Sequence, residues 1–534
     1  MFIRIRKNRG TFKRSVVICH NIRVGNKIRQ VIVKTMGHSL DPMVLEGWLE
    51  EAKAWISARG QSWLIESLPM KKEEVRMKRQ VSLFNLKERA RVNVGIEDIF
   101  GQLYDALGFQ DLLSPSHQKT LRQVLFSRLL EPGSKRRLSE VSEKKLDEEL
   151  PVDRIYRMMD ALLNETDRVQ QKIFEAAKAA HEGYLSLVLF DVTTLSFESI
   201  EEDDLRAFGY SKDFKFNTTQ VTLALATTSE GLPVGFKLFP GNTAESKTLI
   251  ESVTVWREQV PIGKVTVVGD RAMMSQANLL QLESAHFEYV VAFPLRKLSK
   301  AYKECVLDKA SYQENTEGNE INRYRIIEWE GRRLCVSYSE KRALKDKKDR
   351  ERLVEKAKKK LQTCKNVKRL INGKGYLKYS KIKGEAIATL NEEKIKEDEK
   401  WDGLHGVISN KEGCGMEVYA QYRRLWVIEE SFRINKHNLK MRPIYHFTPR
   451  RIQAHILLCT MVFSLVRHLQ FKLQQAAHSM SVARIIDSLR DVQASILVDT
   501  TNDKTYRMLS SLSEDAHKIY KICGVKQESS VVVT

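Results

Sequence analysis

The sequence has few cysteines and no nucleotide-binding loop. Its cysteines lie far apart and form no C-x-x-C pair; the seven positions are 19, 305, 335, 364, 414, 459 and 523. This scatter argues against a zinc ribbon and a disulfide framework, and it fits a reducing cytoplasm. Neither a G-x-x-x-x-G-K-[ST] loop nor a G-x-G-x-x-G fingerprint occurs, so the sequence predicts no nucleotide cofactor.

Long uninterrupted apolar runs are also absent. The most apolar stretch, residues 452–469, is short for a bilayer and contains His455, Arg467 and His468. We therefore expect a buried helix there and no membrane partner. The first ten residues, MFIRIRKNRG, are basic and no apolar segment follows them, so we expect no secretory signal.

Acidic residues are outnumbered by basic ones. The chain has 89 Lys and Arg against 68 Asp and Glu, which gives a net charge of +21 and a pI near 9.5. This surplus favours a polyanionic partner, with nucleic acid as the first candidate, although ribosome-associated and membrane-surface proteins share it. A chain of 534 residues is too long for one core, so we expect two to four domains.

Two acidic residues follow short apolar runs. Residues 185–190 lead into Asp191, and residues 265–269 lead into Asp270. Both runs are typical of buried strands, and ligand sites in open α/β sheets lie at the carboxyl ends of strands. Aspartate at a strand end is also a common turn former, so either residue alone favours a turn.

A third acidic residue lies in a helical pattern at residues 421–445. At roughly 100° per residue, four side chains fall within about 40° of one line together with Leu425; they are Tyr422, Glu429, Arg433 and Lys436. An apolar stripe adjoins this line and places Glu429 at the edge of the buried core; its residues are Leu425, Ile428, Phe432 and Leu439. Glu430 points about 100° away and is the weaker candidate. A surface helix with i,i+4 ion pairs has the same pattern.

Carboxylates from two strand ends and one helix are the hard oxygen ligands that a pair of Mg2+ ions requires. Here the sequence resembles the DDE-class insertion-sequence transposases, in the branch with a tyrosine-arginine-glutamate-lysine signature around the third acid. The matching segments occur in the order of the family: LFDVTTLSFE at 189–198, GYSKD at 209–213, residues 220–249, VTVVGDRAMMSQANL at 265–279, WDGLHGVISN at 401–410, and residues 422–446.

The resemblance implies roles for individual residues. Asp191, Asp270 and Glu429 match the catalytic triad and the ligands of two Mg2+ ions, for which Mn2+ can substitute. Tyr422 and Lys436 match the tyrosine and lysine of the signature and, with Arg433, are the expected DNA-binding residues. The arginine slot holds Leu425 instead.

The resemblance also implies a reaction and partners. We expect two-metal hydrolysis of DNA at the ends of the element, then attack of the freed 3′-hydroxyl on target DNA, without a covalent protein intermediate. The second strand is expected to be cut through a DNA hairpin. The partners are double-stranded DNA, as terminal inverted repeats and target, and a second copy of the chain in a homodimeric DNA complex. The expected location is the bacterial or archaeal cytoplasm, at the nucleoid during the reaction.

The expected fold class is α/β, with a ribonuclease H-like core interrupted between the second and third acids. The 158 residues between Asp270 and Glu429 exceed any simple connection and predict an insertion domain. We divide the chain into a basic β-hairpin module with a helix (1–60), a helical domain (80–180), the first part of the core (184–298), the insertion (299–410), the second part of the core (411–500) and a C-terminal tail (501–534). The pattern at 80–180 fits a DNA-binding domain and a plain helical bundle equally. Residues 482–497 are expected to be helical.

Two other functions fit the sequence. One is a catalytically inactive or domesticated DNA-binding protein, favoured by Leu425 and opposed by the three retained acids. The other is a nuclease of the ribonuclease H fold, which needs the metals but no strand transfer. Inverted repeats around the reading frame would favour the transposase over both.

Overall fold

The computed structural model describes most of the chain, in thirteen segments. They are residues 1–7, 13–24, 27–57, 83–198, 200–209, 217–259, 265–271, 275–317, 320–363, 375–383, 387–412, 415–526 and 531–533. Most of the GYSKD segment, at 210–213, therefore lies outside the described residues. The chain separates into two compact units, Met1–Lys87 with Val498–Lys504, and Glu88–Leu497 with Thr505–Thr534.

The first unit contains a three-stranded antiparallel sheet and a helix. Strands β1 (Phe2–Lys7), β2 (Arg14–Val24) and β3 (Lys27–Ser39) pair in the order β1-β2-β3, and α1 (Pro42–Ser57) follows. Because strand residues alternate between faces, Val16 and Ile18 share one face of β2, and they pack with Leu45 and Ala52 of α1.

The second unit is built on a nine-stranded mixed sheet in the order β10-β11-β12-β15-β9-β8-β5-β6-β7. Strand β5 pairs in parallel with β8, and β8 with β9, whereas the flanking pairs are antiparallel. The strands are β5 (Leu187–Ser196), β6 (Gln220–Thr227), β7 (Pro233–Pro240), β8 (Thr266–Gly269), β9 (Glu288–Phe293), β10 (Gln313–Glu317), β11 (Glu320–Trp329), β12 (Arg332–Tyr338) and β15 (Leu404–Ser409).

Two apolar clusters cover the two faces of this sheet. Leu187 and Leu189 of β5 belong to one cluster, and Val188 and Phe190 belong to the other. This alternation is why the strand reads as a continuous apolar run: both of its faces are buried.

Helices lie on both faces: Ile428 and Phe432 belong to the first cluster, and Leu249 and Leu279 belong to the second. A residue's parity along the strand therefore decides which set of helices it faces.

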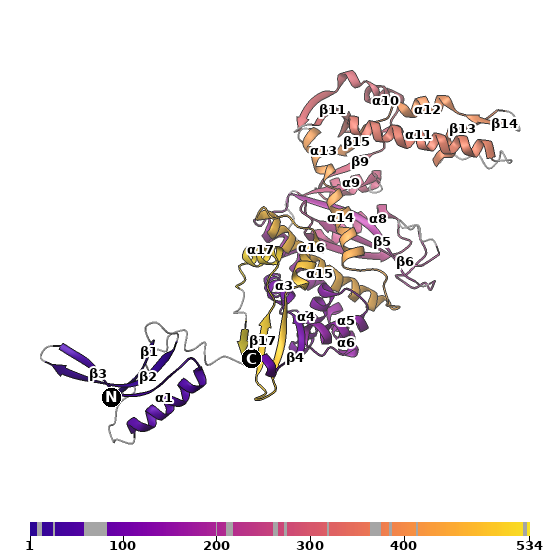
Figure 1. Ribbon diagram of the computed structural model, residues 1–534. Helices are drawn as coiled ribbons and strands as arrows, with labels where there is room; N and C mark the ends of the chain where they lie inside the picture. Colours follow the sequence, from indigo (N-terminus) through magenta and orange to yellow (C-terminus); the bar gives the residue numbers. More distant parts are fainter. Residues whose placement is uncertain are drawn as a thin grey trace. The chain divides into compact units, whose positions relative to one another are not determined.

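Helices supply the rest of the core. They are α3 (Gly95–Ala106), α4 (Pro115–Leu130), α5 (Lys135–Val141), α6 (Val152–Asn164), α7 (Thr166–Ala180), α8 (Glu245–Gln259), α9 (Gln276–Ser284), α10 (Lys300–Leu307), α11 (Glu340–Thr363), α12 (Glu392–Glu399), α13 (Gly415–Arg423), α14 (Trp426–Arg433), α15 (Pro449–Gln475), α16 (Val482–Arg490) and α17 (Glu514–Cys523). Helix α15 packs against α3, α4 and α6 (Figure 1). It is long and apolar enough to cross a membrane, and 89% of its apolar window is buried inside the protein.

Three expectations about the elements were wrong. Residues 482–497 are not one helix, because α16 ends at Arg490 and β16 (Gln493–Asp499) follows. The expected tail, 501–534, contains β17 (Thr505–Leu509), α17 and β18 (Val531–Val533). The expected helical stretch 80–180 includes β4 (Leu86–Asn93), which completes a four-stranded sheet in the order β18-β17-β16-β4.

The residues between the second and third acids include strands of the main sheet and a separate two-stranded sheet. Strands β10, β11, β12 and β15 extend the main sheet beyond β9. Helix α11 carries the lysine-rich segment, and β13 (Ser380–Lys383) pairs with β14 (Ile387–Leu390) in a separate two-stranded sheet.

Candidate active site

Asp191 and Asp270 lie at the same level of two adjacent parallel strands. Leu187, Val188 and Leu189 of β5 pair with Thr266, Val267 and Val268 of β8. Two residues further along each strand, this register places Asp191 beside Asp270. Asp191 is half-buried and Asp270 is exposed.

Both aspartates share the sheet face that α14 covers. Asp191 has the parity of Leu189, and Asp270 has that of Val268; both apolar residues belong to the cluster that also contains Ile428 and Phe432 of α14. One expectation needs correction: Asp191 does not end its strand, because β5 continues to Ser196 through its antiparallel pairing with β6. Only β8 ends before its acid.

The two carboxylates are held locally by backbone amides. The amide of Val192 donates to Oδ1 of Asp191 at 2.7 Å, and the amide of Arg271 donates to Oδ1 of Asp270 at 2.6 Å. These hydrogen bonds restrict the side-chain rotamers of both acids.

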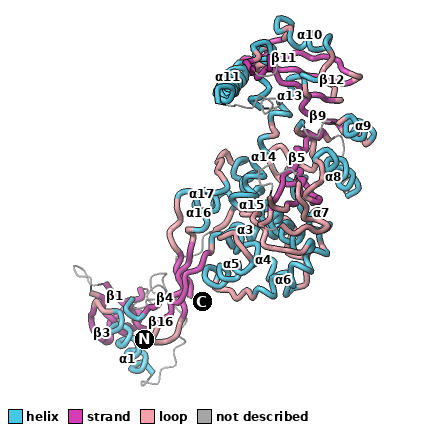
Figure 2. Tube along the Cα trace, turned by 90° about the vertical axis from the view of Figure 1, so that its right-hand side faces the viewer, coloured by secondary structure: helices cyan, strands magenta, loops and turns pink. Residues whose placement is uncertain are grey.

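Helix α14 carries Glu429 over this part of the sheet. It packs against β5 and β6, and Figures 1 and 2 both show it beside β5. Ile428 and Phe432 are buried against the sheet, whereas Glu429 is exposed. The neighbouring Glu430 forms ion pairs with Arg433 at 3.4 Å and with the buried Arg467 at 3.3 Å. Glu430 therefore has a structural role, and Glu429 remains the candidate.

The helical pattern expected at residues 421–445 does not form a single helix. Helix α13 ends at Arg423, and i to i+3 hydrogen bonds from Leu425 to Tyr422 and from Ile428 to Leu425 form a tight turn before α14. After Arg433 the chain forms a π-helical turn, Ile434–Asn438. Tight and wide turns change the rotation per residue, so the projection at 100° per residue does not hold across the segment.

The break changes the positions of the signature residues. Tyr422 lies on α13, Arg433 ends α14 as an exposed partner of Glu430, and Lys436 is half-buried in the π-helical turn. Leu425, in the arginine slot, is only 9% exposed and belongs to the main apolar cluster. This slot is therefore a packing position in this chain.

A tyrosine and a histidine lie close to the acids. The rings of Tyr422 and His405 are 4.9 Å apart. Burial raises the pKa of Tyr422, and the negative charges of Asp270 and Glu429 raise it further. The charges of Asp270 and Glu429 both act on the phenol of Tyr422, so both acids lie near it. The phenol keeps its proton at neutral pH.

His405 is the neighbour that the sequence analysis missed. It lies on β15 with the parity of Val407, on the same sheet face as the aspartates. Burial lowers the pKa of His405 to about 4; the positive charge of Arg342 lowers it too, and Asp270 opposes them. The imidazole is thus neutral at physiological pH. The available signal was its place within the WDGLHGVISN segment, as the titratable side chain between two glycines.

The acids fit divalent metal ions by chemistry, but they do not form a closed cage. Carboxylate oxygens are the ligands that Mg2+ and Mn2+ prefer. Within the described segments, no group of three His, Cys, Asp or Glu side chains lies close enough to hold a metal ion. Mg2+ sites in phosphoryl-transfer enzymes commonly use one or two carboxylates and take their remaining ligands from water and substrate phosphates, and this arrangement is of that open kind.

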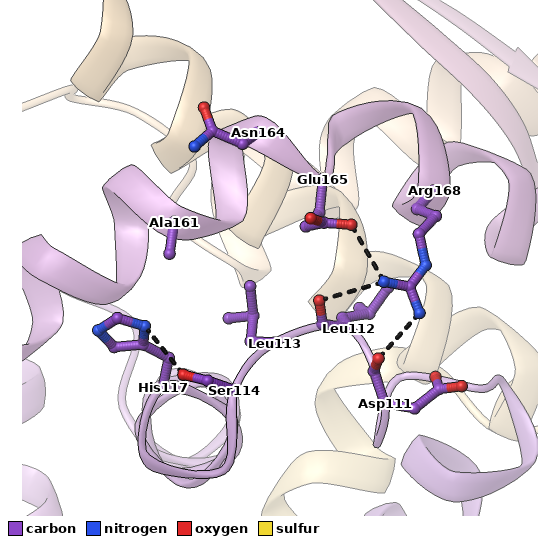
Figure 3. A pocket seen from close by; sticks show the side chains of 9 residues that line it. All are labelled: Asp111, Leu112, Leu113, Ser114, His117, Ala161, Asn164, Glu165 and Arg168. Atoms are coloured by element: carbon purple, nitrogen blue, oxygen red, sulfur yellow. Dashed lines mark hydrogen bonds and ion pairs between the residues drawn. The ribbon is translucent and has the colours of Figure 1, made fainter.

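A separate pocket lies in the helical part of the second unit. Its volume is about 430 Å3; it is lined by Asp111, Leu112, Leu113, Ser114, His117, Ala161, Asn164, Glu165 and Arg168 (Figure 3). Arg168 already pairs with Glu165 at 3.1 Å and donates to the carbonyl of Asp111 at 2.9 Å. The candidate acids are not among its lining residues, so we assign this pocket no part in the reaction.

A comparison with protein-family models identifies a family for this chain. Residues 184–465 match the family model described as transposase DDE domain. A comparison with curated protein sequences gives no match.

Solved structures of transposases resemble the chain weakly. The piggyBac transposase synaptic complex with hairpin DNA has 8% identity and a TM-score of 0.35, with 74% of this chain and 76% of that chain covered. The Mos1 transposase paired-end complex with the left transposon end has 14% identity and a TM-score of 0.15, covering 48% and 74%. The Mos1 mariner paired-end complex with Mn has 13% identity and the same TM-score, covering 48% and 75%. Because these TM-scores are low, we base no argument on them.

Proposed function

We propose a specific reaction for this chain, which belongs to the transposase DDE domain family: hydrolysis of DNA at the ends of an insertion sequence, then attack of the freed 3′-hydroxyl on target DNA. The observation that carries the proposal is the placement of Asp191 and Asp270 at one level of adjacent parallel strands, on the face that α14 covers. Glu429 on that helix supplies the third acid.

We further propose that the sheet contains a ribonuclease H-like core. The order β7-β6-β5-β8-β9 supports this assignment, since three antiparallel strands are followed by two parallel strands added beside β5. Residues 299–410 are then the insertion between the second and third acids, and residues 411–500 return to the core with α14.

The three acids are proposed to hold two Mg2+ ions, with Mn2+ as a substitute. When bound, such ions lower the pKa of the attacking water or hydroxyl and stabilise the departing oxygen. The amide hydrogen bonds to Asp191 and Asp270 orient both carboxylates for this task.

Tyr422 is proposed to bind DNA and not to attack it. Its pKa is raised by burial and by the nearby acids, so the phenol stays protonated and can donate a hydrogen bond to a phosphate oxygen. A covalent phosphotyrosine would need the phenolate, which this environment disfavours. Arg433 and Lys436 are proposed to contact the same DNA backbone.

The proposed substrates are terminal inverted repeats and target DNA in the bacterial or archaeal cytoplasm. The net charge of +21 supports a polyanionic partner. Holding two ends at once requires two active sites, so we propose a homodimer in the DNA complex.

The test is a cleavage assay on the inverted repeats that bracket the reading frame. We expect nicking in Mg2+ by the wild-type chain, and a loss of at least about 10^3-fold in Asp191→Ala, Asp270→Ala and Glu429→Ala, as for removal of a catalytic group. Strand transfer is read separately with a pre-cut end. Equal activity of the three variants and the wild type would falsify the assignment of the acids. Nicking of any duplex without strand transfer would favour a nuclease.

A further inference from the structure

Buried side chains bind three consecutive carbonyl groups just after the π-helical turn that follows α14. Nη2 of Arg128, on α4, donates to the carbonyls of Leu439 and Lys440 at 2.7 and 2.9 Å. Nε2 of His455, on α15, lies 3.1 Å from the carbonyl oxygen of Met441. The chain segment that leaves the candidate active site is therefore held by two other helices.

The hydrogen-bond partners of His455 assign its tautomer. A carbonyl oxygen can only accept, so Nε2 of His455 carries the hydrogen that is donated to Met441. Burial lowers the pKa of His455 well below its usual range, so the ring is neutral and Nδ1 is an acceptor. The amine of Lys135 lies 2.9 Å from Nδ1 and donates to it. Lys135, His455 and the carbonyl of Met441 thus form one chain of hydrogen bonds.

These donors lie in the protein interior. Arg128, Lys135 and His455 are 1%, 4% and 4% exposed, and we call these three residues the carbonyl clamp. Arg128 also donates to the carbonyl of Gly133 at 3.3 Å, so carbonyl oxygens surround its guanidinium. A buried cation is unfavourable unless polar groups compensate it. The inward direction of the bound carbonyls is therefore a requirement of the buried charge.

The clamped residues also close the π-helical turn. The amide of Leu439 donates to the carbonyl of Ile434 at 2.9 Å, and the amide of Met441 donates to that of Asn435 at 2.8 Å. Lys440, between them, has a φ of 43°, in the left-handed region that residues other than glycine rarely adopt. Wide turns of this kind inside helices are frequent at functional sites.

Lys436 lies within this turn and is half-buried. It is three residues before Leu439, the first clamped residue. Glu429 lies further away, on α14, where Ile428 and Phe432 pack against the sheet. The clamp therefore constrains Lys436 more directly than it constrains Glu429.

We propose that Arg128 and His455 are positioning residues, which fix the π-helical turn so that Lys436 is oriented to bind a DNA phosphate. Lys135 orients the ring of His455 through Nδ1. The inference rests on the proposed function in taking Lys436 as a DNA-binding residue. It assigns a task to buried side chains of α4, α5 and α15 that touch neither the acids nor the DNA.

The test uses two amide substitutions of His455 that keep different halves of its hydrogen bonding. Glutamine places its nitrogen near the position of Nε2 and keeps the donor to Met441, whereas asparagine places its oxygen near Nδ1 and does not reach Met441. Arg128→Lys keeps the charge and loses the planar fork that binds two carbonyls. Thr460→Val, which removes another buried hydrogen-bonding group of α15, is the control for loss of packing.

Binding is measured in EDTA by fluorescence anisotropy, with a labelled duplex that carries the inverted repeat. One phosphate contact contributes about 0.9 to the slope of log K against log salt, so Lys436→Gln should lose about 0.9 in slope and about tenfold in affinity at about 50 mM salt. His455→Asn and Arg128→Lys should lose most of the same amount. His455→Gln and Thr460→Val should bind as the wild type does. Equal affinities of His455→Asn, Arg128→Lys and the wild type would overturn the proposal.

A double variant shows whether the clamp acts through Lys436. His455→Asn/Lys436→Gln should bind no more weakly than Lys436→Gln alone, because the contact that the clamp orients is already gone. Two independent structural effects would instead add. Additive losses would therefore contradict a positioning role for His455.

Hydrogen exchange tests the clamp without DNA. The amides of Leu439 and Met441 should exchange faster in His455→Asn and Arg128→Lys than in the wild type or His455→Gln, while the amides of α14 should not change. Unchanged exchange at Leu439 and Met441 in both clamp variants would show that the turn keeps its shape without the clamp, and the inference would be wrong.

This inference and the proposed reaction fail separately, because binding in EDTA does not require the acids. Weaker binding by the clamp variants together with absent cleavage by the wild type would uphold the clamp and reject the reaction. Unchanged binding by the clamp variants together with acid-dependent cleavage would do the reverse. Unchanged binding by Lys436→Gln would also overturn the inference, since the clamp is proposed to act through Lys436.

Discussion

Among single residues, Glu429 and Glu430 are neighbours with opposite surroundings. Glu429 is exposed beside Tyr422, whereas Glu430 neutralises Arg467, which is 4% exposed and also donates to the carbonyls of Gly231 and Glu230 at 2.9 and 3.0 Å. We expect Glu429→Gln to abolish cleavage without a change in stability. We expect Glu430→Gln to keep cleavage and to lower stability by about 1–3 kcal/mol, because it leaves a buried cation without its counter-charge.

Thermal unfolding and single-turnover cleavage of the two variants check this contrast. Ser431→Ala, which removes a buried hydroxyl on the same helix, is the control for general loss of packing. Loss of cleavage in Glu430→Gln with an unchanged midpoint would move the third acid to position 430.

A buried group of basic side chains makes stability depend on pH. Lys135 is buried with its ammonium 2.9 Å from Nδ1 of His455, and burial lowers the pKa of Lys135 to about 7, with the charge of Arg128 acting in the same direction. Burial lowers the pKa of His446 to about 3, and that of His455 lies well below its usual range. All three groups bind protons more weakly in the folded chain than in the unfolded one.

The unfolded chain therefore takes up protons as pH falls, and stability rises with pH through each pair of pKa values. His446 makes stability rise with pH between about pH 3 and 6.5, and Lys135 makes it rise above about pH 7. We expect the thermal midpoint to rise from pH 7 to 8.5, with a slope of at most about 1.4 kcal/mol per pH unit from Lys135. Lys135→Met should remove this slope and keep the acid-side loss. A midpoint of the wild type that falls over this interval would contradict the assignment.

At the scale of elements, the local sequence pattern is sufficient to predict a strand where both faces of that strand are buried. The runs before Asp191 and Asp270 predict strands, and β5 and β8 are there. The same pattern could not show that β5 continues past Asp191, because its later residues are held by β6, about 30 residues away in the sequence. Strand β16 was taken for helix for a related reason: its sheet partner β4 lies some 400 residues earlier, and Asn93 binds the carbonyls of Leu489 and Val492 across that separation.

The candidate helix shows a different limit. Hydrophobic spacing predicts which residues face the core, and Ile428, Phe432 and Leu439 are buried as expected. Spacing does not reveal a tight turn at Leu425 or a π-helical turn after Arg433, because both keep the chain helical while changing its rotation.

The turn at Leu425 allows a direct test of the arginine slot. Leu425 is 9% exposed within the main apolar cluster, so Leu425→Arg places a charge where packing is required. We expect Leu425→Arg to lower stability by at least about 2 kcal/mol and not to raise cleavage. Leu425→Met, which keeps the volume, should cost less than about 1.5 kcal/mol. Faster cleavage by Leu425→Arg with an unchanged midpoint would show that the slot still serves catalysis.

For the whole molecule, metal and DNA should bind cooperatively. The acids come from a strand interior, a strand end and a broken helix, and the described side chains include no cluster of three metal ligands. A site of this kind takes its remaining ligands from the phosphates of the substrate. We therefore expect Mn2+ to raise the thermal midpoint little without DNA and clearly with a duplex, since a ligand at 100 times its Kd contributes about 2.7 kcal/mol.

Thermodynamic linkage makes this coupling measurable through Mn2+ binding or through DNA binding. If DNA tightens Mn2+ binding by some factor, Mn2+ must tighten DNA binding by the same factor, and anisotropy with Ca2+-free Mn2+ titrations gives both values. Asp191→Asn/Asp270→Asn should remove the coupling and keep metal-free DNA binding, because the two changes remove negative charge from a chain whose net charge is already +21. Strong Mn2+ binding by the free chain, unchanged by DNA, would mean that the acids close around metal on their own, and the open site described above would be wrong.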